Sequence, residues 1–193
     1  VIPGPHSTPE HPTFLLKNVR IGIGFHWDRL EDQEFEGTLE IRDNADGTQT
    51  AINRLDVEDY LSSVITSEMS ATSSLELLKA HAVISRSWVL RPIISPSTGT
   101  DKPDLSDPDR HVIWYERDAH GGFDVCADDH CQRYEGITRR DEHPEAAANV
   151  QKAIDATRGQ VLMYDGKVCD ARFYKSCGGA TELFENAWAN EHY

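Results

Sequence analysis

Residues 54–90 read RLDVEDYLSSVITSEMSATSSLELLKAHAVISRSWVL and predict two helices joined by a short polar link. Asp56 can cap a first helix that begins near Val57, because its carboxylate accepts a hydrogen bond from a free backbone N–H. The apolar residues of this helix recur at helical spacing and are Tyr60, Leu61, Val64, Ile65 and Met69. A second helix over 73–93 follows the link, with a serine available as its cap. This helix pair is the expected centre of the fold.

Strands are expected on the N-terminal side of the helix pair. The runs 18–25 and 34–42 place apolar residues in the alternating pattern of a strand. Asp46 and Gly47 supply a turn after the second run. The helix pair is therefore preceded by short β-strands.

On the C-terminal side, 112–115 is a brief strand candidate and 141–159 is a third predicted helix. Pro144 lies near the start of that helix, and Gly159 lies just past its end. The run 160–174 predicts a β-hairpin that turns at an Asp-Gly pair. Together with the helix pair, these elements predict the α+β class.

The length of 193 residues predicts one domain. Residues 1–14, rich in proline and histidine, are expected to be an extended lead-in to a domain that covers 15–193. The polar, proline-rich stretch 95–109 is expected to be a flexible surface insertion. The chain ends NAWANEHY without a turn or cap, so a truncation is expected there.

The charge balance excludes one class of partner. The chain has 33 acidic and 19 basic residues, a formal net charge of −14. Nucleic acid is therefore not expected as a partner, because binding phosphates requires a basic face. The apolar runs fall far below the roughly 20 residues that span a bilayer. The opening VIPGPHSTPEHPTF contains no signal peptide and is expected to be a stub that follows a removed signal, anchor or upstream domain.

Soft metal ligands gather in residues 119–132, AHGGFDVCADDHCQ. His120, Cys126, His130 and Cys131 are the ligand types that Zn²⁺ prefers, and four of them close a tetrahedral structural site. The alternative is a disulfide between the two cysteines, but a disulfide leaves the histidines unexplained. A catalytic zinc is less favoured, because four protein ligands leave no open coordination position. Structural Zn²⁺ is therefore the expected cofactor.

The helix pair resembles the signature of the stage II sporulation protein D family, which includes the amidase enhancer proteins. The residues that carry this resemblance are Leu55, Glu58, Asp59, Tyr60, Leu61, Val64, Glu68, Met69, Leu75, Glu76, Leu78, Lys79, Ala80, Ala82, Val83, Arg86 and Ser87. A second match is HGGFDVCADDHCQRYEG (120–136), and a third is RFYKSCGGATE (172–182) followed by NAW (186–188). The three matches occur in the family's order and span most of the chain.

Four features depart from the family pattern. Ser70 follows the Glu-Met pair where the family usually has proline, and His81 stands where glutamine is common. Cys177 occupies a position where a small polar residue is frequent, and the insertion 95–109 belongs to this chain. None of these departures removes a residue of the implied catalytic set, although they bear on substrate preference.

The resemblance implies a peptidoglycan lytic transglycosylase, which cuts the β-1,4 bond between N-acetylmuramic acid and N-acetylglucosamine without water. One acidic residue protonates the leaving oxygen and then takes the proton of the C6 hydroxyl, which closes a 1,6-anhydro ring. By resemblance this residue is Glu68, and Lys79 and Arg86 are active-site bases that bind sugar and lactyl oxygens. Lys175 and Ser176 are weaker candidates for substrate binding.

The residues themselves allow this mechanism. Glu68 ends an apolar helix face, where burial and the partial negative charge of a helix C-terminus favour the protonated form that a general acid needs. Lys79 and Arg86 lie seven residues apart on one side of the second helix, which can fold back toward Glu68. A solvated glutamate and two solvated bases are the alternative. Cys169 and Cys177 can pair with each other or be free thiols, and burial as small apolar residues is the default expectation for both.

Two other functions remain open at this point. The first is a non-catalytic cell-wall-binding module that helps an amidase, as the amidase enhancer name implies. The second is a small zinc-dependent hydrolase, which requires a metal with an open coordination position near Glu68. The resemblance implies an extracytoplasmic protein of the cell envelope or a secreted one. Its implied partners are peptidoglycan glycan strands and a cell-wall amidase.

Overall fold

The computed structural model describes residues 2–94, 108–109, 120–127, 130–142, 144–174 and 176–183. Some predictions lie outside these residues. They concern Lys175, the strand over 112–115, the NAW motif at 186–188, the C-terminal end and all of the 95–109 insertion except its last two residues.

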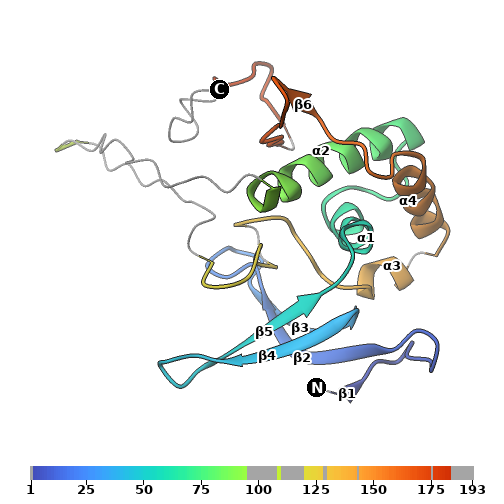
Figure 1. Cartoon of the computed structure of the whole chain (residues 1–193), viewed down its shortest axis with the longest axis vertical. Helices are drawn as coiled ribbons and strands as arrows, with labels where there is room; N and C mark the ends of the chain where they lie inside the picture. Colours follow the sequence, from blue (N-terminus) through green and yellow to red (C-terminus); the bar gives the residue numbers. More distant parts are fainter. Residues whose placement is uncertain are drawn as a thin grey trace.

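Antiparallel strands form one side of the molecule (Figure 1). Strand β2 (Thr13–Ile21) lies between β1 (Ile2–Pro3) and β3 (Arg29–Glu36), and β4 (Thr38–Asp43) pairs with β5 (Gln49–Arg54). The stretch expected as an extended lead-in therefore contributes β1 and the first residues of β2 to a sheet. The turn predicted between the last two of these strands is confirmed, since a backbone hydrogen bond closes it.

The strand predicted over 34–42 is two strands, because Gly37 divides it. Gly37 has φ of 84°, a conformation that glycine adopts far more readily than other residues. A Cβ at this position would lie 2.4 Å from the carbonyl oxygen of Arg54. The strand predicted over 18–25 also starts earlier and ends before Gly22, where φ is 69°. Glycine turns therefore set the strand boundaries.

The predicted helix pair is confirmed as α1 (Val57–Glu68) and α2 (Leu75–Ile94). The carboxylate of Asp56 accepts a 2.9 Å hydrogen bond from the backbone N–H of Glu58, as expected of an N-cap. Ser74 precedes α2, and its hydroxyl accepts a 3.3 Å hydrogen bond from a backbone N–H of the first turn. Local capping therefore fixes where each helix begins.

The third predicted helix is two helices, α3 (Thr138–Glu142) and α4 (Pro144–Ala156). Pro144 begins α4, because its ring fits the first helical position but cannot continue a helix that precedes it. Gly159, with φ of 70°, follows the end of α4 as expected. The predicted hairpin is confirmed as the short strands β6 (Met163–Tyr164) and β7 (Lys167–Val168).

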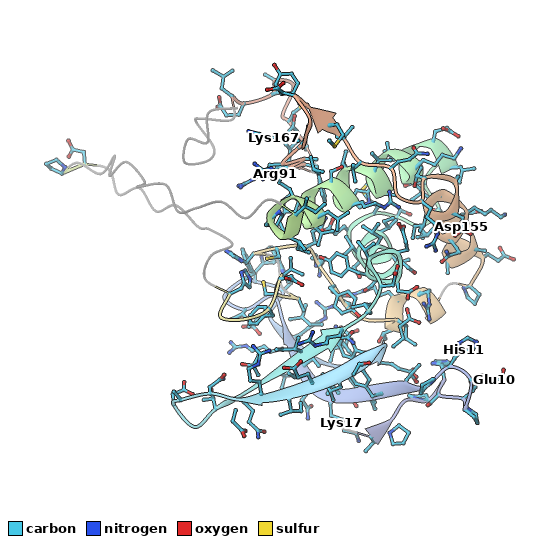
Figure 2. The ribbon with its side chains drawn as sticks, in the orientation of Figure 1. Glu10, His11, Lys17, Arg91, Asp155 and Lys167 are labelled. Atoms are coloured by element: carbon cyan, nitrogen blue, oxygen red, sulfur yellow. The ribbon has the colours of Figure 1, made fainter. Side chains whose placement is uncertain are left out.

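Helix α1 lies at the centre, with α2 and α4 on one side and the strands on the other (Figure 1). The apolar core combines residues of β3, α1, α2, α4 and the segment before α3. It consists of Phe35, Tyr60, Leu61, Val64, Ile65, Leu78, Ala82, Trp88, Val89, Tyr134, Val150, Ala153 and Ile154. Charged side chains such as Asp155 and Lys167 lie at the periphery (Figure 2). No helix among the described residues is long and apolar enough to cross a membrane. The molecule is the mixed α+β structure that the sequence predicts.

A buried ion pair joins α1, α2 and the turn after α4. Arg86 of α2 is fully buried, and its Nε and Nη2 donate to the two carboxylate oxygens of Glu58 over 3.0 and 2.6 Å. Its Nη1 donates to the carbonyl oxygen of Gln160 over 2.9 Å. The backbone N–H of Gly159 donates to Glu58 over 3.3 Å. Three segments of the chain are therefore held at one point.

We predict that Arg86→Ala lowers the free energy of unfolding by about 3–5 kcal/mol, because Glu58 then remains buried without its counter-charge. Arg20→Ala is the matched control, since Arg20 pairs with Asp28 at the surface, and an exposed pair contributes about 0–1 kcal/mol. Denaturant unfolding of both variants measures the difference. Equal stability of the two variants would contradict the structural role given to Arg86.

Candidate functional site

Glu68 is the last residue of α1, and its side chain is 14% exposed. Its Oε1 accepts a 3.0 Å hydrogen bond from the backbone N–H of Arg133. Its Oε2 is buried and has no hydrogen-bond partner. Among the described residues, no lysine or arginine forms an ion pair with Glu68. The carboxyl is therefore held by a neutral backbone donor and not by a fixed cation.

His81 of α2 is the side chain that faces the free oxygen of Glu68. Its Nε2 lies 3.4 Å from Glu68 Oε2, and the side chain is 2% exposed. Neither ring nitrogen has a hydrogen-bond partner. The edge of Phe173 packs against the imidazole, with ring centroids 4.9 Å apart and planes at 88°. Phe173 thereby brings the segment after β7 to the same place.

The segment 131–135 runs along α1 and is hydrogen-bonded to it at three points. Besides the contact with Glu68, the hydroxyl of Tyr60 donates to Gln132 Oε1 over 3.0 Å, and the backbone N–H of Glu135 donates to the hydroxyl of Ser63 over 3.1 Å. Burial raises the pKa of Tyr60, and the nearby Cys131 and Glu68 act in the same direction. The Tyr60 hydroxyl therefore stays protonated and remains a donor.

The four predicted metal ligands lie together at the start of this segment. The ligand atoms of His120, Cys126, His130 and Cys131 are all within 4.8 Å of one another. Cys131 Sγ lies 3.4 Å from His120 Nε2 and 3.6 Å from His130 Nδ1, and Cys126 Sγ lies 3.8 Å from His130 Nδ1. With a Zn–S bond of about 2.3 Å and a Zn–N bond of about 2.05 Å, a tetrahedral angle separates sulfur from nitrogen by roughly 3.6 Å. The cluster is therefore consistent with a zinc site.

The thiols bear on the alternative pairings. No disulfide joins Cys126 to Cys131 or Cys169 to Cys177. Cys169 is half-buried and Cys177 is exposed, so the burial expected of this second pair is wrong for Cys177. The loop of the cluster is joined to the sheet layer by Arg42 of β4, whose Nη1 donates to the carbonyl oxygen of Gly122 over 2.9 Å.

The two helix bases have other partners than Glu68. Lys79 Nζ lies 2.8 Å from Glu76 Oε1 at the surface of α2. Arg86 is fully buried and bound to Glu58, so its guanidinium is not exposed to a glycan. This geometry gives no support to the expectation that Arg86 contacts substrate, and no ion pair joins Lys79 to Glu68.

The segment after β7 carries the remaining substrate-binding candidates. Ser176 is exposed and accepts a 3.4 Å hydrogen bond from the backbone N–H of Gly178. Lys175 lies outside the described residues. Tyr174 is 59% exposed beside Phe173, which contacts His81. Their roles in binding stay predictions.

Sequence reasoning missed two groups beside Glu68. The backbone N–H of Arg133 is invisible to any search for catalytic side chains, because it reaches Glu68 only through the path of the folded chain. His81 did carry a signal, since it is a departure within the helix signature, thirteen residues after Glu68. Nothing in the spacing shows that its ring faces the carboxyl.

The chain is similar in sequence to stage II sporulation and amidase enhancer proteins. It is 25% identical over 141 residues to stage II sporulation protein D of Bacillus subtilis. The aligned residues make up 72% of this chain and 37% of that protein. It is 30% identical over 130 residues to the amidase enhancer of the same organism. The aligned residues make up 67% of this chain and 14% of that protein. An uncharacterized protein of Brachyspira hyodysenteriae is 28% identical over 141 residues, 73% of this chain and 31% of that protein.

The chain thus spans little more than a third of the length of these relatives at most. Residues 45–164 match the family model SpoIID, described as stage II sporulation protein. That match covers more than half of the chain, from the turn after β4 to β6. The chain belongs to the SpoIID family.

Proposed function

We propose that this chain is the catalytic domain of an extracytoplasmic murein lytic transglycosylase, with Glu68 as its single general acid and base. The observation that carries the proposal is the setting of Glu68, a largely buried carboxyl at a helix end. One of its oxygens is bound by a backbone N–H, and no lysine or arginine of the described residues is paired with it. A carboxyl that must both give and take a proton needs such an environment, because a tightly paired carboxylate holds its charge. Family membership supports the choice of substrate.

In the proposed reaction one carboxyl, that of Glu68, both gives and takes a proton. Glu68 gives its proton to the glycosidic oxygen while the bond from that oxygen to C1 of N-acetylmuramic acid breaks. The resulting carboxylate takes the proton of the C6 hydroxyl, and O6 bonds to C1. No water is consumed, and Glu68 ends as it began. Ordinary glycosidases use two carboxylates, whereas the proposed mechanism uses one.

Glycan contacts belong to the same proposal. Lys79 and Ser176 lie at the surface, where hydroxyl and carboxylate oxygens of a glycan can reach them. We keep Lys79, Lys175 and Ser176 as proposed substrate-binding residues. We give Arg86 an indirect role, in which it holds α1 and α2 together and thereby keeps Glu68 and His81 facing each other.

The metal cluster is proposed to be a structural zinc site. Four protein ligands close a tetrahedron, so the site stabilises the fold and offers no position to a reacting water. Cys131 lies two residues before Arg133, whose backbone N–H binds Glu68. A metal on Cys131 therefore restrains the chain that holds the carboxyl, and the zinc-hydrolase alternative is disfavoured by the same ligand count.

A non-catalytic role remains the second candidate, because one relative is named an amidase enhancer. In that case the chain binds cell wall but releases no product. A product assay on purified peptidoglycan separates the two functions. Anhydro-muramyl ends mark the transglycosylase, whereas retention on the wall without release marks a binding module.

We predict that Glu68→Gln lowers the formation of anhydro-muramyl products at least about 100-fold, because an amide can neither give nor take the proton. The fold is kept, since the amide oxygen still accepts the hydrogen bond of Arg133, and sedimentation with purified wall reports unchanged binding. Glu145→Gln, an exposed residue at the start of α4, is the matched control and keeps full activity. Comparable turnover by the two variants would refute the assignment of Glu68.

We predict that the purified protein contains one Zn²⁺ per chain and that Cys126→Ser loses most of it. Cys177→Ser is the matched control, because Cys177 is an exposed free thiol outside the cluster, and it keeps the metal. Metal affinity falls in acid, since cysteine binds as the thiolate and protons compete for it. Elemental analysis and thermal unfolding test both points, and a metal-free wild type that unfolds at the same temperature as the metal-containing protein would exclude a structural zinc.

A further inference from the structure

Among the described residues, the imidazole of His81 forms a polar contact with Glu68. Nε2 lies 3.4 Å from Glu68 Oε2, and the ring is 2% exposed. Both ring nitrogens are buried without a hydrogen-bond partner, as is Glu68 Oε2. Leaving a buried polar atom unpaired is unfavourable, because the atom has lost its hydrogen bonds to water. Glu68 Oε2 and His81 Nε2 are therefore complementary, since each lacks a partner that the other can supply.

The distance between them is longer than an ideal hydrogen bond, which is about 2.7–3.2 Å. Catalytic contacts are often long in an unliganded site and shorten when substrate binds. The ring is held for this contact by its own helix and by the edge of Phe173. A hydrogen bond between the two atoms therefore requires a rotation of one of the two side chains.

The two oxygens of Glu68 differ in what surrounds them. Oε1 accepts from the backbone N–H of Arg133 over 3.0 Å, whereas Oε2 is buried against His81. A carboxylic acid carries its proton on one oxygen at a time, and a hydroxyl oxygen can still accept an N–H. A proton on Oε2 would lie on a buried atom. A proton on Oε1 is compatible with the hydrogen bond from Arg133.

We propose that His81 is a positioning residue that, as a neutral imidazole protonated on Nε2, donates to Oε2 and so keeps the exchangeable proton of Glu68 on Oε1. This inference rests on the proposed role of Glu68 as the acid and base. When Oε1–H gives its proton to the leaving oxygen, both oxygens of the new carboxylate keep a donor, Arg133 N–H on Oε1 and His81 Nε2–H on Oε2. The carboxylate therefore stays in place to take the C6 hydroxyl proton on the same oxygen.

His81→Phe tests the proposal, because phenylalanine keeps the ring and its packing on Phe173 but has no nitrogen. We expect kcat to fall about 10- to 100-fold, in line with the cost of a misplaced catalytic group, while KM for purified glycan strands stays within about twofold. His81→Gln restores an N–H donor, and we expect it to recover most of the lost turnover. Full turnover by His81→Phe, or equal losses in His81→Phe and His81→Gln, would overturn the proposal.

Ser87→Ala is the matched structural control. Ser87 is buried on the same helix, and its hydroxyl accepts a 2.8 Å hydrogen bond from the backbone N–H of Leu162 and donates to Val83. This variant is expected to lose stability and to keep kcat once folded. If Ser87→Ala lowers kcat as much as His81→Phe does, His81 acts only through the fold and the proposal fails.

The tautomer gives a measurement that needs no variant. Nitrogen-15 spectra of the imidazoles, with His81 assigned from its loss in His81→Gln, are expected to show a neutral ring with the proton on Nε2. A proton on Nδ1 only, with Nε2 accepting from Glu68, would reverse the direction of the hydrogen bond and refute the inference.

The two levels of the proposal fail in different ways. Normal product formation by Glu68→Gln refutes the role of Glu68 and, with it, that of His81. An inactive Glu68→Gln beside a fully active His81→Phe refutes the positioning role alone. In the Glu68→Gln background, His81→Phe is expected to add no further loss, because His81 acts through Glu68.

Discussion

The buried pair between Glu58 and Arg86 is the interaction on which the arrangement of the site depends. It joins the first turn of α1 to the middle of α2 and to the turn after α4. Glu68 lies ten residues after Glu58 on the same helix, about 15 Å away at 1.5 Å per residue. Because α1 is rigid and its first turn is fixed, the position of its last residue is fixed as well. The pair therefore acts on the site from a distance, through a helix.

A second constraint comes from the segment 131–135. Its hydrogen bonds to Tyr60, Ser63 and Glu68 follow α1 from its first turn to its last. The ligand cluster ends at Cys131, so the chain leaves the cluster and immediately meets α1. Cys131 of the cluster and Arg133, which binds Glu68, are only two residues apart, so the position of the cluster restrains the position of the Glu68 carboxyl. Structural metal binding contributes to folding free energy, and here that contribution would reach the site directly.

The elements that could be predicted from sequence are those that local chemistry decides. Asp56 caps α1 by its own side chain, and an Asp-Gly pair turns the β6–β7 hairpin. What could not be predicted depends on distant neighbours. The strand is interrupted at Gly37, where the carbonyl of Arg54, seventeen residues later, leaves no room for a Cβ. The same holds for Arg86. Its spacing of seven residues from Lys79 suggested a shared role, but its partner is Glu58, and no spacing rule connects these two residues.

The two ends of α1 carry two glutamates that the structure treats differently. Glu58 accepts two hydrogen bonds from a buried guanidinium and a third from a backbone N–H, so its carboxylate has a fixed counter-charge. Glu68 accepts one backbone N–H and faces a histidine, with no lysine or arginine paired to it in the described part of the chain. A carboxyl bound by a permanent cation suits a framework, whereas one held only by neutral donors can exist in both protonation states. The difference in partners, more than the difference in burial, distinguishes the two carboxyls.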